Sequence, residues 1–227
     1  MPSVPAYCNP AAYELLSSRM PVIETSTALL DAANAIALHG MDHVDRRDVD
    51  TELQHLTEEI RARVRSDDQQ ALLAHAHEIL FDEYGLGGNR EDYYDPYNSY
   101  VPAVLDSRVG IPITLTLIYK NVLERLGLCV YGLNAPGHFL AEVELEDDVM
   151  IVDPFAGGMI HNRDEAFDLI ESMAGMPIER SPQLLQRATH RQWIARILRN
   201  LAHLFDESGD RGNCAAMLEM QTLVLTE

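Results

Sequence analysis

SRVGIPITLTLIYKNVLERLGL, residues 107–128, predicts a buried helix against which the rest of the chain can pack. The turn at 108–110 leads into Pro112, and proline suits the first turn of a helix because that position needs no backbone N–H donor. The apolar pattern continues to Leu126, and Gly127 is a typical helix stop. We therefore expect a central helix from Pro112 to Leu126.

Three apolar segments follow this helix and predict an antiparallel sheet. They are LCVYGLN (128–134), HFLAEVELE (138–146) and VMIVDPF (149–155). The middle segment alternates apolar and polar residues, as a strand with one buried face does, although Leu140 breaks the alternation. Asp147 and Asp148 are suited to the hairpin turn that precedes the last segment.

Helical patterns flank this central part on both sides. They cover residues 26–40, 49–66, 67–85, 162–175, 189–210 and 211–227. The third opens on Asp67 and Asp68, and Gly209 marks the bend between the last two. We therefore predict an α+β protein with an N-terminal helical lobe (1–84), a core of helix and sheet (85–165) and C-terminal helices that end in a hairpin (166–227).

The segment between the first lobe and the central helix is dense in Gly, Asn, Asp and Tyr, which favours an ordered loop with a short helix near Asn98. Tyr93, Tyr94 and Asn98 could line a cleft that grips an extended peptide. Alternatively, the tyrosines cover the sheet and the polar residues form turns. The sequence leaves both interpretations open.

The charge balance restricts the class of partner. The chain has 36 Asp and Glu against 17 Lys and Arg, a formal net charge of −19, and Lys120 is its only lysine. Such a field repels nucleic acid and anionic membranes, so we expect neither as a partner. The first residues lack a signal-peptide pattern and no apolar run is long enough to span a bilayer, which predicts a cytoplasmic protein.

Cysteines and histidines give no clear metal or redox motif. The three cysteines are far apart, and we expect Cys129 to be buried because its neighbours are apolar. The pairs His39/His43 and His75/His77 have no clear third ligand. We therefore predict no metal site and no cofactor.

The order of the central elements, with one strand beginning at His138 and another ending at Asp153, resembles the transglutaminase-like, papain-related core. Three segments together resemble more closely the bacterial SirB-type transglutaminase-like proteins, which typically end in a tetratricopeptide-like hairpin. They are GGNREDYYDPYNSYVPAVLDSRVGIPITLTLIYKNVLERLGL, GLNAPGHFL and VDPFAGG. The resemblance covers about residues 25–227 and implies the fold more than a reaction.

The resemblance also assigns expected roles. In active members of the superfamily the helix opens with Gly-x-Cys, whose cysteine is the nucleophile; His138 matches the base and Asp153 the group that orients it. Gly110-Ile111-Pro112 falls where Gly-x-Cys would lie, so Pro112 occupies the position of the nucleophile. Proline keeps the helix start but carries no reactive group.

Two functional hypotheses follow. In the first, a catalytically silent core acts as an interaction or regulatory scaffold. It binds a protein or peptide in a cleft near Pro112, His138, Asn134 and the tyrosine loop (residues 93–100). In the second, the protein is a hydrolase or acyltransferase in which His138 activates a water molecule or Thr114. A purely structural alternative is that His138 and Asp153 tie two strands together.

The last helices carry an apolar stripe of Trp193, Ile197 and Leu201. A stripe at this spacing favours packing over a docking groove.

Overall fold

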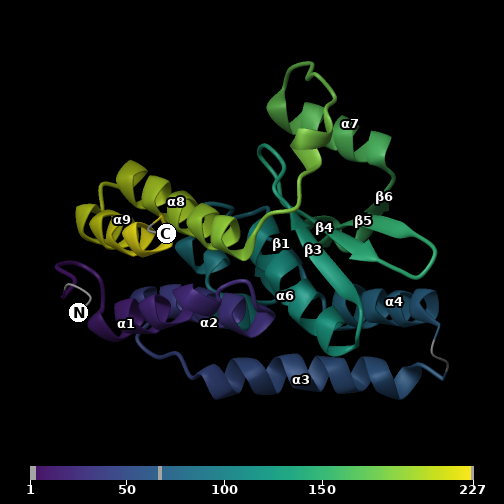
Figure 1. Cartoon of the computed structure of the whole chain (residues 1–227), viewed down its shortest axis with the longest axis horizontal. Helices are drawn as coiled ribbons and strands as arrows, with labels where there is room; N and C mark the ends of the chain where they lie inside the picture. The colour runs from purple at the N-terminus through teal and green to yellow at the C-terminus, as the bar shows by residue number, and fades with distance from the viewer. Residues whose placement is uncertain (1–3, 66–67, 226–227) are drawn as a thin grey trace.

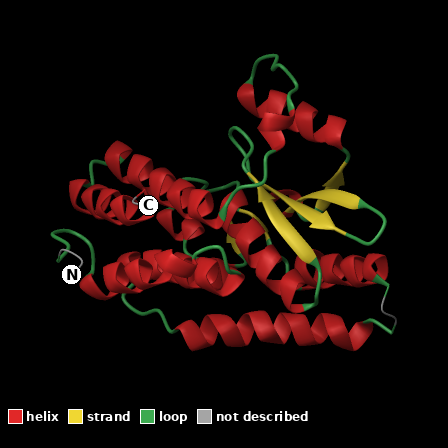
Figure 2. Cartoon of the chain, in the orientation of Figure 1, coloured by secondary structure: helices red, strands yellow, loops and turns green. Residues whose placement is uncertain are grey.

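The computed structural model describes residues 4–65 and 68–225 and combines helices with a sheet, so the protein is α+β (Figure 2). Helix α6 (Pro112–Arg125) crosses the centre of the molecule (Figure 1). Every residue from Pro112 to Leu123 is buried, which explains why this segment is apolar almost all round. The predicted helix start is confirmed, and the helix ends one residue before the predicted end.

Four strands follow α6 and form an antiparallel sheet in the order β3-β4-β5-β6. Their bounds are β3 (Cys129–Leu133), β4 (Leu140–Glu144), β5 (Val149–Asp153) and β6 (Met159–His161). Strands β4 and β5 pair with Ala141 opposite Val152, and the hairpin between them contains the expected Asp147-Asp148 turn. The three predicted strand segments are therefore confirmed, and β6 is an additional edge strand.

The sheet is covered on both faces. Phe139, Ala141 and Val143 belong to the main hydrophobic core on the α6 side. Leu140 points the other way, into a second cluster formed with helix α7 (Arg163–Ala174), which lies above the sheet in Figure 1. Leu140 breaks the alternation because a helix covers the face that would otherwise be exposed to water.

The N-terminal part is helical: the three predicted helices are present, and a helix over residues 10–19 is additional. Its helices are α1 (Pro10–Arg19), α2 (Ser26–Gly40), α3 (Arg46–Arg63) and α4 (Gln69–His77), with a short turn η1 (Met20–Val22) after α1 and a π-helical turn η2 (Glu78–Glu83) after α4. The side chain of Asp68 caps α4 by accepting a hydrogen bond from the Gln70 N–H, whereas Asp67 lies outside the described residues.

Short elements connect this lobe to α6. They are β1 (Gly87–Gly88), η3 (Pro96–Ser99), α5 (Val101–Ser107) and β2 (Val109–Gly110), and β1 pairs with β2 in parallel. The expected short helix near Asn98 is thus a 3₁₀ turn followed by α5. The turn η4 (Pro154–Ala156) connects β5 to β6, and η5 (Pro182–Leu185) lies between α7 and α8.

Helices α8 (His190–Glu207) and α9 (Arg211–Leu225) form a hairpin, and Gly209 at the bend has a φ of 76°, which glycine adopts without strain. Trp193, Ile197 and Leu201 are buried in the main core, so the apolar stripe is a packing surface. Residues from α1 to α9 contribute to this one core, whereas the division of the chain at residues 84 and 165 remains an expectation.

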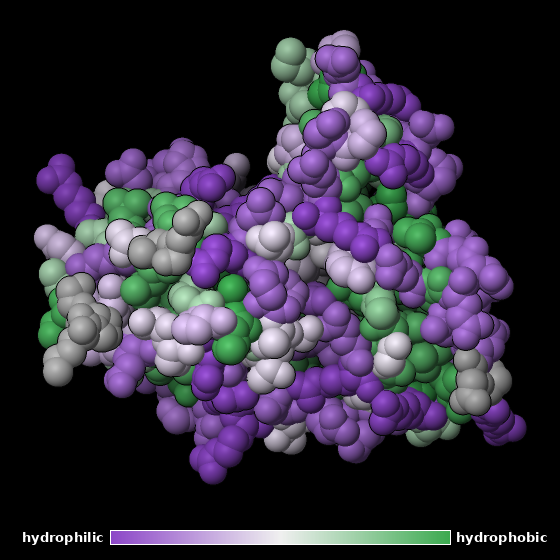
Figure 3. Space-filling view, in the orientation of Figure 1, coloured by the Kyte–Doolittle hydropathy of each residue, from purple (hydrophilic) through white to green (hydrophobic). Residues whose placement is uncertain are grey.

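The visible surface is largely hydrophilic, with hydrophobic groups gathered at the base of α7 and over the neighbouring sheet (Figure 3). Within residues 4–65 and 68–225, no helix is long and apolar enough to cross a membrane.

Candidate functional site

His138 and Asp153 lie close together at the open end of the β4–β5 hairpin, opposite its turn. His138 lies two residues before β4 and Asp153 ends β5, so antiparallel pairing brings the two side chains together. Nε2 of His138 lies 2.9 Å from Oδ2 of Asp153, and the ring nitrogen donates because a carboxylate only accepts. Both residues are buried, with exposed fractions of 3% and 2%.

The second oxygen of Asp153 is also occupied. Its Oδ1 accepts the backbone N–H groups of Phe155 at 3.0 Å and Ala156 at 3.3 Å, which caps the turn η4. The carboxylate is therefore fixed by backbone donors on one side and orients the imidazole on the other.

The remaining nitrogen of His138 has no such partner. Nδ1 is buried and has no hydrogen-bond partner within the described part of the chain. Because Nε2 carries the donated proton, Nδ1 of the neutral ring is the basic nitrogen. The ring of Phe155 stands edge-on to the imidazole, with the ring centroids 5.9 Å apart. The Phe155 ring in turn contacts the Tyr93 ring, with centroids 5.9 Å apart, and the Arg90 Cζ lies 5.1 Å from the Phe155 centroid.

The start of α6 is held against Phe139, the residue that follows His138. Trp193 donates a hydrogen bond from Nε1 to the Ile113 carbonyl at 3.2 Å, and its ring packs on Phe139 at 4.6 Å. Thr116 Oγ1 donates to the carbonyl of Phe139, the residue after His138, at 3.3 Å. The first turn of α6, with Pro112 at its first position, is thus fixed next to the strand that carries the imidazole.

Thr114 is the third residue of α6 and is fully buried, with an exposed fraction of 0%. Its hydroxyl makes no hydrogen bond with any described residue, so it does not act as the helix cap expected of a first-turn threonine. Access from solvent to this hydroxyl is closed.

A cavity of about 210 Å³ opens beside the pair. The tyrosine loop lines one side with Tyr93, Tyr94 and Asp95, and α8 lines the other with residues that include Arg196 and Glu207. Ile111 and Gly137, the residues directly before Pro112 and His138, lie in its wall. Pro112 and His138 therefore sit behind the wall of this cavity and do not line it.

The other predicted binding residues differ in their positions. Tyr94 is 73% exposed and lines the cavity, whereas Asn98 is buried. The side-chain nitrogen of Asn98 donates to the Asp92 and Tyr93 carbonyls, and its side-chain oxygen accepts a hydrogen bond from Asn89 Nδ2. Asn98 therefore holds the loop in shape and does not line the cavity, and its role in binding remains a prediction.

Asn134 is exposed, and its Oδ1 accepts a hydrogen bond from Arg196 on α8. It therefore braces a cavity residue that sequence analysis did not identify. Burial lowers the pKa of Arg196, and burial also raises the pKa of the Tyr93 hydroxyl across the cavity. The functional candidates at this cavity are consequently Arg196, Tyr93 and Tyr94.

The cysteines correct a further expectation. Cys129 is exposed because it is the first residue of β3 and faces away from the core, while Val130 faces inward. Cys8 is the buried thiol, and burial together with the Glu219 carboxylate raises its pKa to about 12. In the described residues, no group of three or more His, Cys, Asp and Glu side chains is placed to hold a metal ion.

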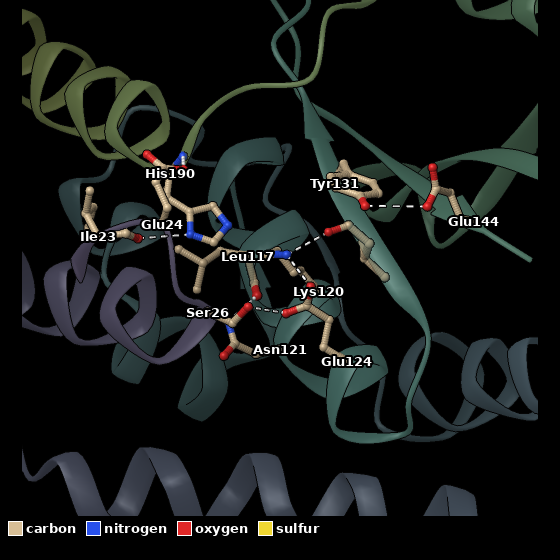
Figure 4. A network of polar contacts seen from close by, with 11 residues as sticks. Ile23, Glu24, Ser26, Leu117, Lys120, Asn121, Glu124, Tyr131, Glu144 and His190 are labelled. Atoms are coloured by element: carbon tan, nitrogen blue, oxygen red, sulfur yellow. Dashed lines mark hydrogen bonds and ion pairs between the residues drawn. The ribbon is translucent and has the colours of Figure 1, made fainter.

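A second buried polar cluster lies along the other half of α6 (Figure 4). Lys120 Nζ donates to the Val130 carbonyl at 2.6 Å and pairs with Glu124, whose other oxygen accepts the Ser26 hydroxyl. Burial lowers the pKa of the nearby His190, and the Lys120 charge adds to this effect. A single lysine inside an apolar helix was the sequence signal for this cluster.

Comparison with known protein families matches residues 47–199 to the transglutaminase-like superfamily. A UPF0162 protein of Xylella fastidiosa is 34% identical over 195 residues, which are 84% of this chain and 69% of that protein. A UPF0162 protein of Pseudomonas aeruginosa is 27% identical over 199 residues, which are 87% of this chain and 71% of that protein. F-box only protein 21 of Mus musculus is 44% identical over 62 residues, only 27% of this chain and 10% of that protein.

No solved structure matches the chain. This protein belongs to the transglutaminase-like superfamily. Both UPF0162 proteins described above match most of the chain's length. The SirB-type resemblance and the tetratricopeptide-like character of the α8–α9 hairpin remain predictions.

Proposed function

We propose that this protein is a non-catalytic member of its superfamily and acts as a cytoplasmic interaction or regulatory scaffold, which binds a protein or peptide segment in the cavity between the tyrosine loop and α8. The observation that carries the proposal is Pro112 at the first position of α6, where the family resemblance places the nucleophile, in a protein that retains the His138–Asp153 hydrogen bond. Proline supplies no nucleophile, and it also lacks the backbone N–H that a helix start can offer to a developing oxyanion.

Burial of the polar side chains supports the same proposal. The hydroxyl of Thr114 is closed to solvent, and the His138 ring is 3% exposed. A general base must come within hydrogen-bond distance of the proton that it removes. Because the His138 ring is buried in the core, a substrate in solution does not come within that distance. The cavity next to the pair is open and carries aromatic side chains, which suits recognition of a peptide.

A second candidate is a hydrolase or acyltransferase. It is favoured by one specific observation, the unpartnered basic Nδ1 of His138 near the start of α6. In this alternative His138 activates a water molecule or Thr114, and Asp153 orients the ring.

Capture of partners by two matched tyrosine variants tests the scaffold. Tyr94→Ala removes a cavity side chain, whereas Tyr97→Ala removes an exposed tyrosine of the same loop outside the cavity. Immobilised proteins are incubated with lysate of the source cells, and the recovered proteins are quantified by mass spectrometry. We expect Tyr94→Ala to lose a defined partner at least fivefold and Tyr97→Ala to retain it within twofold. Equal recovery by both variants contradicts the proposal.

Turnover decides between the two candidates. Purified wild type and His138→Ala are assayed with chromogenic acyl esters and acyl amides, and unfolding curves verify that the variant is folded. The scaffold predicts rates equal to the buffer background for both proteins. Turnover by the wild type that disappears in folded His138→Ala supports the hydrolase instead.

A further inference from the structure

Arg196 on α8 lines the wall of the cavity with only two of its five N–H donors engaged. Its two hydrogen bonds both use Nη1, which donates to Asn134 Oδ1 and, at 2.8 Å, to the Ala135 carbonyl. Among residues 4–65 and 68–225, its Nε and Nη2 donate no hydrogen bond. These two nitrogens form one edge of the guanidinium, the edge that matches a carboxylate in bidentate geometry.

The charge of Arg196 has no counter-ion in the described chain. Several arginines of this acidic protein pair with carboxylates, as Arg187 does with Glu142 and Glu144. Arg196 is partly buried, yet no Asp or Glu of the described residues forms an ion pair with it. A desolvated cation without a partner costs free energy, which a bound anion would return.

The guanidinium is also held in place before any ligand arrives. Nη1 is anchored at the loop that leads to His138, and the guanidinium lies over the Phe139 ring at 5.5 Å. A fixed fork loses little side-chain entropy on binding, so recognition of a planar group is favoured.

We propose that the Nε–Nη2 edge of Arg196 receives the carboxylate of a peptide residue that enters the cavity. This inference rests on the proposed function and names the group that the scaffold recognises. A cavity of about 210 Å³ has room for a group of the size of one residue. Asp95 and Glu207 also line it and oppose further negative charge, so a ligand with one carboxylate is preferred over a polyanion.

The carboxylate can come from a glutamate side chain or from a peptide C-terminus, and short peptides distinguish these sources. The probes are acetyl-Gly-Glu-Gly-amide with its Gln counterpart, and acetyl-Gly-Gly-Gly acid with its C-terminal amide. The full chain is labelled with ¹⁵N-arginine, and the Nε–H resonance of Arg196, assigned by its absence in Arg196→Lys, is followed by NMR. We expect a saturable shift with at least one acid peptide and no shift with the matching amide peptide.

Two variants separate this role from general charge. Arg196→Gln should weaken binding of the acid peptide at least tenfold, followed by backbone amide shifts of the cavity residues. Arg199→Gln, an exposed arginine on the same helix outside the cavity, should stay within twofold of the wild type. Thermal unfolding verifies that both variants are folded.

Equal shifts with acid and amide peptides, or no shift of the Nε–H resonance with any peptide, overturn the inference. The wild-type resonance decides this even where Arg196→Gln is unstable. If these probes fail while Tyr94→Ala still loses a captured partner, the scaffold stands and only the carboxylate assignment is wrong.

Discussion

The two ends of α6 bury polar side chains in opposite ways. In the C-terminal half, Lys120 is neutralised by Glu124 and donates to a strand carbonyl, so the buried charge has partners. At the N-terminal end, Thr114 Oγ1 and His138 Nδ1 have no partner in the described chain. Satisfied polar groups stabilise a unique fold, whereas unsatisfied ones lower stability and are typical of sites that serve another purpose.

The largest expected effect is at the satisfied end. Lys120→Met leaves the Glu124 carboxylate and the Val130 carbonyl without their cation, and we expect a loss of about 3 kcal/mol in the free energy of unfolding. Urea denaturation followed by the fluorescence of Trp193, the only tryptophan and fully buried, measures it. Lys120→Met/Glu124→Gln should recover part of the loss because it removes the uncompensated charge. A loss below about 1 kcal/mol contradicts the importance of the pair.

The middle of α6 provides a pH-dependent test. His77 Nε2 lies 2.7 Å from the hydroxyl of Tyr119, and burial lowers the pKa of His77 from 6.5 to about 4. The unfolded chain therefore takes up this proton first, so the stability contribution is present above pH 6.5 and is lost as the pH falls toward 4. We expect a loss of about 2 kcal/mol over this range.

Paired unfolding curves isolate the contribution of His77 to the pH dependence of the free energy of unfolding. Wild type and His77→Gln are denatured with urea at several pH values between 7 and 4, and the difference between their pH slopes reports the histidine. A difference of zero would show that His77 is protonated as easily in the folded protein as in the unfolded chain.

Local patterns predicted the backbone around α6 well. Pro112 and Gly127 mark the two ends of the helix, and period-two alternation indicated the strands, whereas the pairing of His138 with Asp153 was implied by the family resemblance. These features depend on neighbours in sequence or on adjacent strands, which is why one sequence is enough to find them.

Features that depend on a distant covering element were not predictable. Leu140 is buried by α7. Cys129 is exposed because it lies at the start of β3, whereas Leu133, at the other end of the same strand face, is buried in the α7 cluster. Arg196 meets Asn134 and Ala135 across 62 and 61 residues of chain, and no periodicity links them. The sequence was therefore enough to predict the pair of His138 and Asp153. The cavity beside it could not be predicted, because it is formed by the packing of α8.

The smallest expected effect tests the unsatisfied end directly. Thr114→Val replaces an unpartnered buried hydroxyl by a methyl group of similar size, so we expect a gain of about 0.5 kcal/mol in the free energy of unfolding. Thr116→Val is the matched control on the same helix, where the hydroxyl donates to the Phe139 carbonyl, and we expect it to lose about 1 kcal/mol. The sign of the difference, measured by urea denaturation of both variants, carries the test. If Thr114→Val loses as much as Thr116→Val, the Thr114 hydroxyl is satisfied in the folded protein and the contrast between the two ends of α6 disappears.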